Sequence, residues 1–526
     1  MWSADAPQGD ETGKIRWETV PFCRGRGLDL GCGPKKLFPH VIGIDNRKDT
    51  ELFGIQMKPD LLLDVTDLSM FSNGSMNFVY SSHTLEHFPY EDVPKILREW
   101  WRVITVGGFL ILYLPDEDTY PKVGEPGANP DHKWNVNAAK VCEAMPKGWE
   151  LIEDQKRSDA NEYSIFLVFR KRADKECRVM ARKEPPTKTI ALTRFGAAIG
   201  DILLVSSVAA GLKEQGYHVT LFSSPPADQV ILTDPNIDRL IVQDDGQVPN
   251  EWLGDYWCYW RSRFERWVNL SECMETTLLA NPGRMTYEWA PAARHKLMNL
   301  NYLEVQHMLA RVPHDPQVRF YATDEEGQWA DRMERKLLGD RETCIVGWVM
   351  SGSARTHKAW PYLDPTLTAL LRLMPHVRVV LMGAPKDVEL AKGWENKERV
   401  TVAAGNWTLR QTLTFASYCH VMVGPETGIM NAVSGMWMPK IVFLSHSTHE
   451  NLTRDWVNTC ALHAPETKCP GRGNNEAPAC HQMHYTFEPA CRRHEGLGVA
   501  QCQAEITPER VWPILERAIH TGVAKE

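Results

Sequence analysis

Two glycine-rich turns, each directly after an apolar run, carry the residues of this sequence best placed to do chemistry. The first is Leu28-Asp29-Leu30-Gly31-Cys32-Gly33, and the second is Arg194-Phe195-Gly196-Ala197-Ala198-Ile199-Gly200-Asp201. A turn of this kind at the end of a strand presents backbone N–H groups to a ligand in an α/β sheet. Two such turns on one chain predict a bifunctional enzyme that handles two activated donors.

An ordered series of residues follows the first turn. Asp45 ends the apolar segment Ile42-Gly43-Ile44, a position where an acid accepts hydrogen bonds from ribose hydroxyls. Asp64 ends another apolar run. Ser82-His83-Thr84-Leu85-Glu86-His87 comes next, and Gly107-Gly108 precedes a further apolar run.

This series resembles class I S-adenosylmethionine-dependent methyltransferases over about residues 22–172, in the group with a Leu-Glu-His motif and a shortened first helix. The resemblance implies that S-adenosyl-L-methionine is the cofactor and Ser82 and His83 flank the acceptor. It also implies a set of cofactor-binding residues, with Asp29, Gly31 and Gly33 at the methionine end, Asp45 at the ribose and Asp64 by the adenine, and this set also includes Ser82. The glycine turn alone would equally fit a plain dinucleotide-binding domain.

The methylated atom is not specified by any motif. The sequence lacks the Asn/Asp-Pro-Pro-Tyr/Phe motif of base-amino methylation and the Pro-Cys pair of cytosine C5 chemistry. Transfer to oxygen needs mainly positioning and a general base. His83, His87 and His132 are candidates, with His83 as the catalytic prediction, although each could instead be a packing or capping histidine.

The second turn places Asp201 at the start of an expected helix. Farther along, Ser351-Gly352-Ser353 follows a strand with Lys358 nearby, which suits a pyrophosphate. Glu426-Thr427-Gly428 forms another strand, tight turn and helix start. Asp201 by itself would equally fit a helix N-cap.

Together these motifs resemble the ADP-heptose:lipopolysaccharide heptosyltransferases (glycosyltransferase family 9), over about residues 188–522. The resemblance implies inverting transfer from a nucleotide-diphosphate sugar, with Asp201 as the general base. It implies a set of nucleotide-sugar-binding residues: Ser351, Gly352, Ser353, Lys358, Glu426, Thr427 and Gly428. An acid near Asp387 or Glu389 is expected to contact the nucleoside. Glu426 and Asn431 stand where Asp and His are common in that family, which leaves the donor sugar open.

Four cysteines recur at intervals of eleven residues: Cys469, Cys480, Cys491 and Cys502. Thiolates in such a group can bind a structural zinc, and disulfides or packed thiols are the alternatives. The cysteines lie in a glycine- and proline-rich excursion over 465–503.

The elements that must position these motifs are those of an α/β protein. Apolar runs alternate with amphipathic stretches such as Asp92–Ile104, which predicts mainly parallel sheets. We expect a Rossmann-like methyltransferase domain over 1–172, a linker over 173–188, and two facing Rossmann-like domains in the GT-B arrangement. These last are an acceptor domain over 189–340 and a nucleotide-sugar domain over 341–526, with the final helix, Pro508–Ile519, packed on the first of the two.

Composition narrows the partners. No apolar run among the 526 residues reaches the roughly 18 that a membrane span needs, and no secretory signal is evident, so we expect a cytoplasmic enzyme; peripheral membrane contact stays open. The net charge of −8 argues against a large nucleic-acid footprint. The expected acceptor is a glycan, a glycolipid (such as lipopolysaccharide) or a small molecule. Two alternatives remain: an enzyme that glycosylates and methylates a nucleic-acid base, and a scaffold with one inactive half.

Overall fold

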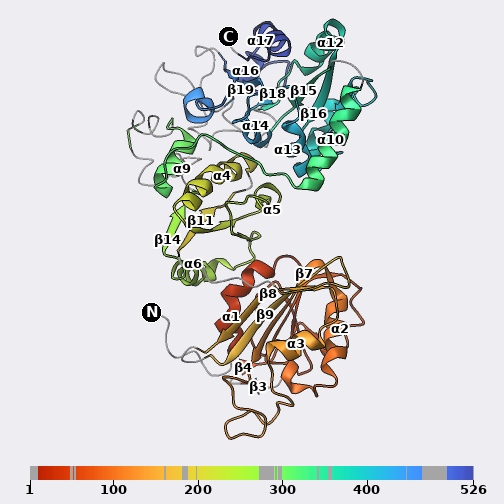
Figure 1. Ribbon diagram of the computed structural model, residues 1–526, viewed down its shortest axis with the longest axis vertical. Helices are drawn as coiled ribbons and strands as arrows, with labels where there is room; N and C mark the ends of the chain where they lie inside the picture. The colour runs from red at the N-terminus through yellow and green to blue at the C-terminus, as the bar shows by residue number, and fades with distance from the viewer. Residues whose placement is uncertain are drawn as a thin grey trace. The chain divides into compact units, whose positions relative to one another are not determined.

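The chain forms two compact units in its computed structural model, shown in Figure 1. The first unit is Met1–Pro186 with Gln243–Arg263, and the second is Thr187–Val242 with Phe264–Glu526. The structure describes residues 10–47, 51–52, 55–158, 162–180, 188–196, 198–271, 289–290, 293, 296, 299–339, 343–352, 358–445, 447–464 and 494–524.

An eight-stranded sheet forms the centre of the first unit, in the order β10-β8-β9-β7-β6-β1-β2-β5. Strand β1, which leads to the first glycine turn, is parallel to its neighbours β2 and β6, and β6 is parallel to β7. Strand β9 is antiparallel to both of its neighbours, β7 and β8. Every residue of β1 is buried, as expected for a strand covered on both faces. The bounds of these strands are β1 Gly27–Leu30, β2 Ile42–Asp45, β5 Leu61–Leu62, β6 Met76–Ser82, β7 Ile104–Pro115, β8 Trp149–Arg157, β9 Ser164–Lys171 and β10 Arg178–Met180, and a hairpin adds β3 Glu51–Leu52 and β4 Ile55–Gln56.

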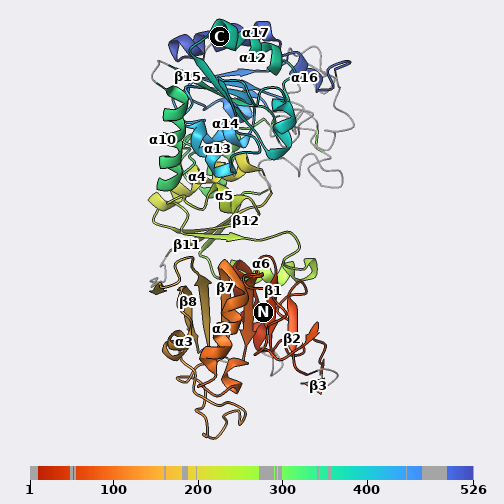
Figure 2. The same ribbon diagram turned by 90° about the vertical axis from the view of Figure 1, so that its right-hand side faces the viewer.

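Short helices cover this sheet (Figure 2). The predicted helix is present as α2, Val93–Val103, whose apolar face includes Val93, Leu97 and Trp100. Residues 31–41 form turns and no helix, so the expected shortening of the first helix is confirmed. The remaining helices of the unit are α1 Glu11–Thr19, η1 Val20–Phe22, η2 Leu85–His87, α3 Ala138–Ala144, η3 Asn250–Trp252 and α6 Leu253–Arg261.

The segment Gln243–Arg263 groups with the first unit although the sequence places it inside the expected domain 189–340. The Trp17 ring of α1 meets Trp252 and Tyr256 edge-on, with ring centroids 6.1 and 5.8 Å apart. Tyr256 is fully buried. Because these aromatic side chains pack on α1, the segment groups with the first unit and not with the rest of the expected domain 189–340.

The first half of the second unit has a four-stranded parallel sheet in the order β13-β12-β11-β14. Helix α4 is apolar on most of its surface, and its buried residues belong to one hydrophobic core with residues of β11 and β12. The bounds are β11 Thr189–Arg194, α4 Ile199–Glu214, β12 His218–Ser223, α5 Ala227–Val230, β13 Arg239–Val242, β14 Arg266–Asn269, α9 Tyr302–Ala310 and α10 Asp324–Leu338.

The second half has a six-stranded parallel sheet in the order β17-β16-β15-β18-β19-β20. Two parallel sheets in one unit agree with the predicted pair of Rossmann-like halves. The bounds are β15 Cys344–Val349, α12 Leu363–Leu373, β16 Val377–Met382, η5 Pro385–Ala391, β17 Val400–Val402, α13 Leu409–Ala416, β18 Val421–Pro425, α14 Gly428–Ala432, β19 Lys440–Phe443, η6 His449–Thr453, β20 Thr459–Leu462, α16 Gln501–Ala504 and α17 Pro508–Thr521.

The last helix packs on the second half, so the expectation that it returns to the first half is wrong. Val511 and Leu515 of α17 belong to one buried cluster with Val346 of β15 and Leu381 of β16. Both views place α17 beside α12 (Figures 1 and 2). Helix α10 also packs on the second half, with Trp329 edge-on to Trp407 at 5.0 Å. Among the helices that the structure describes, none is long and apolar enough to cross a membrane.

Candidate functional site

Three neighbouring strands of the first unit bring the predicted donor-binding residues to one edge of the sheet. Asp29 lies in β1, Asp45 ends β2 and Ser82 ends β6, and β1 lies between the other two strands. In open α/β sheets, ligands bind at the carboxyl ends of such strands. The sheet order thus gathers residues that the sequence spreads over more than fifty positions.

The glycine turn after β1 has one crowded and one open position. Gly31 has a φ of +72°, and a Cβ there would lie 2.2 Å from Thr84 Oγ1. Gly33 has a φ of +57°, and a Cβ there would meet no described heavy atom within 4 Å. Its N–H donates to Asp45 Oδ2 at 3.3 Å. The turn therefore links the two predicted ligand residues and leaves space beside Gly33.

Asp29 and Asp64 have opposite environments. Asp29 is 1% exposed and accepts a hydrogen bond from Leu37 N at 2.8 Å. Burial raises the pKa of its carboxyl group to about 7. Asp64 is exposed after β5, and its Oδ1 accepts from Thr66 N and from Thr66 Oγ1 at 2.8 and 2.7 Å.

His83 occupies the acceptor side in a left-handed backbone conformation, with a φ of +47°. Its Nε2 lies 2.9 Å from Ser164 Oγ, and its ring meets Tyr113 and Tyr163 edge-on. Burial lowers the pKa of the imidazole to about 3, so the ring is neutral at pH 7 and takes up a proton reluctantly. Its predicted role as a general base stays a prediction.

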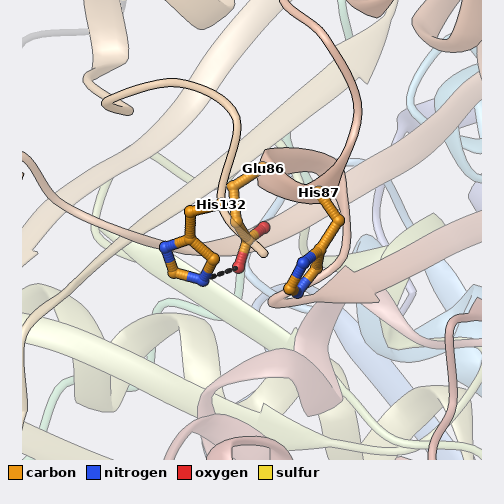
Figure 3. Close-up of side chains that lie close together, drawn as sticks. All are labelled: Glu86, His87 and His132. Atoms are coloured by element: carbon orange, nitrogen blue, oxygen red, sulfur yellow. Dashed lines mark ion pairs between the residues drawn. The ribbon is translucent and has the colours of Figure 1, made fainter. Parts of the chain in front are cut away.

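Glu86, His87 and His132 form a cluster next to His83, shown in Figure 3. Their nearest ligand atoms all lie within 4.8 Å of one another. Glu86 and His87 belong to η2, whereas His132 comes from the loop between β7 and α3. Lys133 N donates to the carbonyl oxygen of Glu86 at 2.8 Å and so holds this loop against η2.

Partly buried polar contacts fix the turn after β11 in the second unit. Phe195 N donates to Ser271 Oγ at 2.9 Å, and Gly196 N donates to Ser224 Oγ at 3.0 Å. Arg194, only 1% exposed, donates through Nη2 to Asp201 Oδ2 at 2.5 Å. Asp201 therefore lies in the first turn of α4 with its carboxylate oriented by a buried guanidinium.

The starts of helices α4 and α14 meet, although one belongs to each half of the unit. A Cβ on Gly200 would lie 2.5 Å from Asn431 Nδ2, and a Cβ on Gly428 would lie 2.9 Å from Gly200 N. Thr427 caps α14 with its side chain. Asp201 and the Thr427-Gly428 turn, predicted from separate motifs, are thus brought together.

Lys358 lies beside the Thr427-Gly428 turn. Its Nζ donates to the backbone carbonyl of Glu426 at 2.8 Å, and its side chain packs against Gly352, next to Thr427. Burial lowers the pKa of its ammonium group, while the negative charges of Glu426 and Asp201 act in the opposite direction. Asp201 is therefore close enough to Lys358 to act on its charge.

Two predicted ligand residues use their polar side chains inside the protein. Ser351 is 3% exposed and donates to Asp387 Oδ1 at 2.6 Å. Glu426 is 3% exposed and accepts hydrogen bonds from the Ser445 hydroxyl and backbone N–H at 2.5 and 3.1 Å. These side chains shape the loops after β15 and β18.

The expected nucleoside contact of Asp387 is not supported by the geometry. The carboxylate is 1% exposed and also accepts from Ala384 N at 2.8 Å, at the start of η5. Both of its oxygens are thus bonded within the protein. The sequence does not indicate this role, because an acidic residue after a strand has the same pattern whether it binds a ligand or a neighbouring loop.

Several expectations lie outside the described residues. Ser353 is one, and three of the four cysteines, Cys469, Cys480 and Cys491, are the others. Cys502 is described and lies buried in α16. The predicted zinc site at the cysteines therefore stays a prediction.

Arg194 is the site residue that sequence reasoning missed in the second unit. Arg194 comes directly after an apolar run and two positions before Gly196, a pattern that is typical of an exposed residue at the end of a strand. Its burial against Asp201 depends on the fold. In the first unit, the adjacent Glu86 and His87 are visible in the sequence as possible ligands. Their proximity to His132 is set by the fold and has no signal in the sequence.

Comparison with known proteins found several similar solved structures. Solved structures similar to the chain include a family 9 glycosyl transferase from Veillonella parvula (20% identity, TM-score 0.42, 53% of this chain and 87% of the other). They also include the E. coli ADP-heptose LPS heptosyltransferase II (15% identity, TM-score 0.43, 63% and 98%). A SAM-dependent methyltransferase from Methanosarcina mazei matches at 16% identity and a TM-score of 0.22, over 28% of this chain and 92% of the other.

Among curated protein sequences, none matches the chain. Residues 28–112 match the family described as "Methyltransferase domain". These residues contain the glycine turn, Asp45, Asp64 and the Leu-Glu-His motif. The first unit of the chain therefore contains a methyltransferase domain.

Proposed function

We propose that the chain transfers two groups: a methyl group from S-adenosyl-L-methionine at the first unit, and a sugar from a nucleotide-diphosphate sugar at the second. The acceptor is a glycan, a glycolipid head group or a small molecule. An acidic chain with no base-methylation motif favours these acceptors over nucleic acid.

The methyl donor would lie beside the open side of Gly33. Asp45, held by the N–H of Gly33, is placed to accept hydrogen bonds from ribose hydroxyls. Asp29, one strand away in β1, would meet the donor's amino group. His83 and Ser82 would then face the acceptor, at the end of β6.

The observation that carries the sugar-transfer proposal is the convergence of Asp201, Lys358 and the Thr427-Gly428 turn from three separate segments. The acceptor hydroxyl would lose its proton to Asp201 as its oxygen attacks the sugar's anomeric carbon. The bond from that carbon to the diphosphate breaks, and the diphosphate leaves with the electron pair. Lys358 and the backbone N–H groups at the start of α14 would stabilise its negative charge.

Replacing Asp201 by Asn tests this assignment. We expect release of nucleoside diphosphate from a panel of nucleotide-diphosphate sugars to slow by about 10²–10⁴-fold, with unchanged binding of the nucleoside diphosphate. Glu214→Gln, at the exposed end of the same helix, is the matched control and should react as the wild type does. Wild-type rates in the Asp201→Asn variant would refute the role of Asp201 as the base.

A further inference from the structure

The side-chain carboxyl group of Glu86 is buried and lacks a hydrogen-bond partner among the residues that the structure describes. Its side chain is 0% exposed, and neither carboxylate oxygen makes a hydrogen bond with any residue that the structure describes. Two imidazole nitrogens face its Oε1, His83 Nδ1 at 3.5 Å and His132 Nε2 at 3.7 Å, and both distances are too long for a hydrogen bond. A buried carboxylate without a partner costs several kcal/mol, so such a group normally binds a cation or stays protonated.

The groups that surround this carboxylate are metal ligands. His87 and His132 lie on opposite sides of it, with ring centroids 5.1 Å apart (Figure 3). The ligand atoms of the three side chains lie within 4.8 Å of one another. Zinc binds imidazole nitrogen and carboxylate oxygen at about 2.0–2.2 Å, and two imidazoles with one carboxylate are a common ligand set.

Further contacts hold the residues of the cluster in position, as is usual for metal ligands. The hydrogen bond from Lys133 N to the carbonyl of Glu86 fixes the position of the neighbouring His132. The His132 ring packs on Tyr120, with centroids 5.3 Å apart. His87 is only partly buried, so solvent reaches this member of the cluster.

We propose that Glu86, His87 and His132 form a site for one divalent transition-metal ion of zinc-like chemistry. Three protein ligands leave a fourth position for water or for an oxygen atom of a small molecule. His83 lies directly beside Glu86, so this position faces the methyl-acceptor side; that placement, unlike the binding of the ion, rests on the proposed function.

Zinc binding to the full chain tests the proposal without any assay of methyl transfer. Chelator-treated protein is dialysed against buffered free Zn²⁺, and the bound zinc per chain is counted for the wild type and for Glu86→Gln, His87→Asn and His132→Asn. Each variant should bind one zinc fewer than the wild type. His40→Asn, an exposed histidine of the same unit, is the matched control and should bind as much as the wild type. The C-terminal cysteines are unchanged throughout and add only a constant.

Equal zinc in the wild type and in all three variants would overturn the proposal. Glu86→Gln keeps the size of a buried side chain and His87→Asn alters a partly exposed ring, so at least one variant is expected to fold, as far-UV circular dichroism will show. A wild type that binds one zinc more than the variants but binds no S-adenosylhomocysteine would count against the proposed function alone. Normal binding of S-adenosylhomocysteine without a zinc difference would count against the metal site alone.

Discussion

The side-chain amide of Gln247 donates a 2.7 Å hydrogen bond to the backbone carbonyl of Val20, 227 positions earlier in the chain. Glu18 in α1 likewise binds both the Tyr259 hydroxyl and Arg157 of β8. A segment that interrupts the second unit in sequence is thus part of the first unit's structure. The unit that contains the methyltransferase domain therefore also includes residues far beyond it in the sequence.

Replacing Tyr256 by Ala should destabilise the first unit by about 3–5 kcal/mol, because a fully buried aromatic side chain is removed. Differential scanning calorimetry measures the effect on the transition that S-adenosylhomocysteine shifts. Trp437→Ala, at a residue 75% exposed, is the control and should leave the transition in place. A Tyr256→Ala variant with a wild-type transition would contradict the role of this segment.

Affinity for S-adenosylhomocysteine should depend on pH through Asp29. Burial raises the pKa of this carboxyl group to about 7, so it is mostly neutral at pH 6 and mostly ionised at pH 8. The ionised form attracts the ligand's ammonium group, so binding should tighten by up to about tenfold across this range. Isothermal titration at both pH values measures it, and Asp29→Asn should bind with little pH dependence. A wild-type affinity that is flat with pH would argue against contact between Asp29 and the amino group.

Affinity for a nucleoside diphosphate should fall at alkaline pH through Lys358. Burial lowers the pKa of this ammonium group, so it loses its charge at a lower pH than an exposed lysine does. Lys358→Arg should retain binding at alkaline pH, because arginine keeps its charge. Lys358→Met should weaken binding by about 10–100-fold at pH 7, the usual loss for a hydrogen bond to a charged group. Unchanged binding in the Met variant would place the diphosphate elsewhere.

Stability should rise with pH above neutrality because of Lys440. This lysine is fully buried in β19, donates to the carbonyls of Met436 and Met438, and has its pKa lowered by burial to about 7. Between this pKa and the ordinary value near 10.5, the unfolded chain binds more protons than the folded chain, so raising the pH favours folding. Lys440→Met should remove this part of the slope of unfolding free energy against pH. An identical slope in both proteins would show that Lys440 is not neutralised on folding.

The strands and the donor turn could be predicted because their signals are local. The strand β15, Cys344–Val349, is a short run of apolar residues in the sequence, and all of its residues are buried in the structure. Gly33 and Asp45 could be predicted as partners because strand ends of a parallel sheet meet at one edge.

Choices among distant partners could not be predicted. The apolar stripe of α17 would fit the face of either sheet, and only the packed structure places Leu515 with Val346. Gln247 and Glu18 are ordinary polar residues until the fold buries them. The hydrogen bond between Ser351 and Asp387 could not be predicted either. The two residues belong to separate motifs, and each was expected to contact the ligand.

Two donor sites on one chain are the central claim, and titration of the full-length protein with both ligand classes tests it most directly. Isothermal titration should show one S-adenosylhomocysteine per chain and one nucleoside diphosphate from a panel of ADP, GDP, UDP and CDP. Asp45→Ala should abolish only the first binding event, and Lys358→Met should weaken only the second. A folded wild-type sample that fails to bind S-adenosylhomocysteine, or that binds no nucleoside diphosphate, would contradict the account.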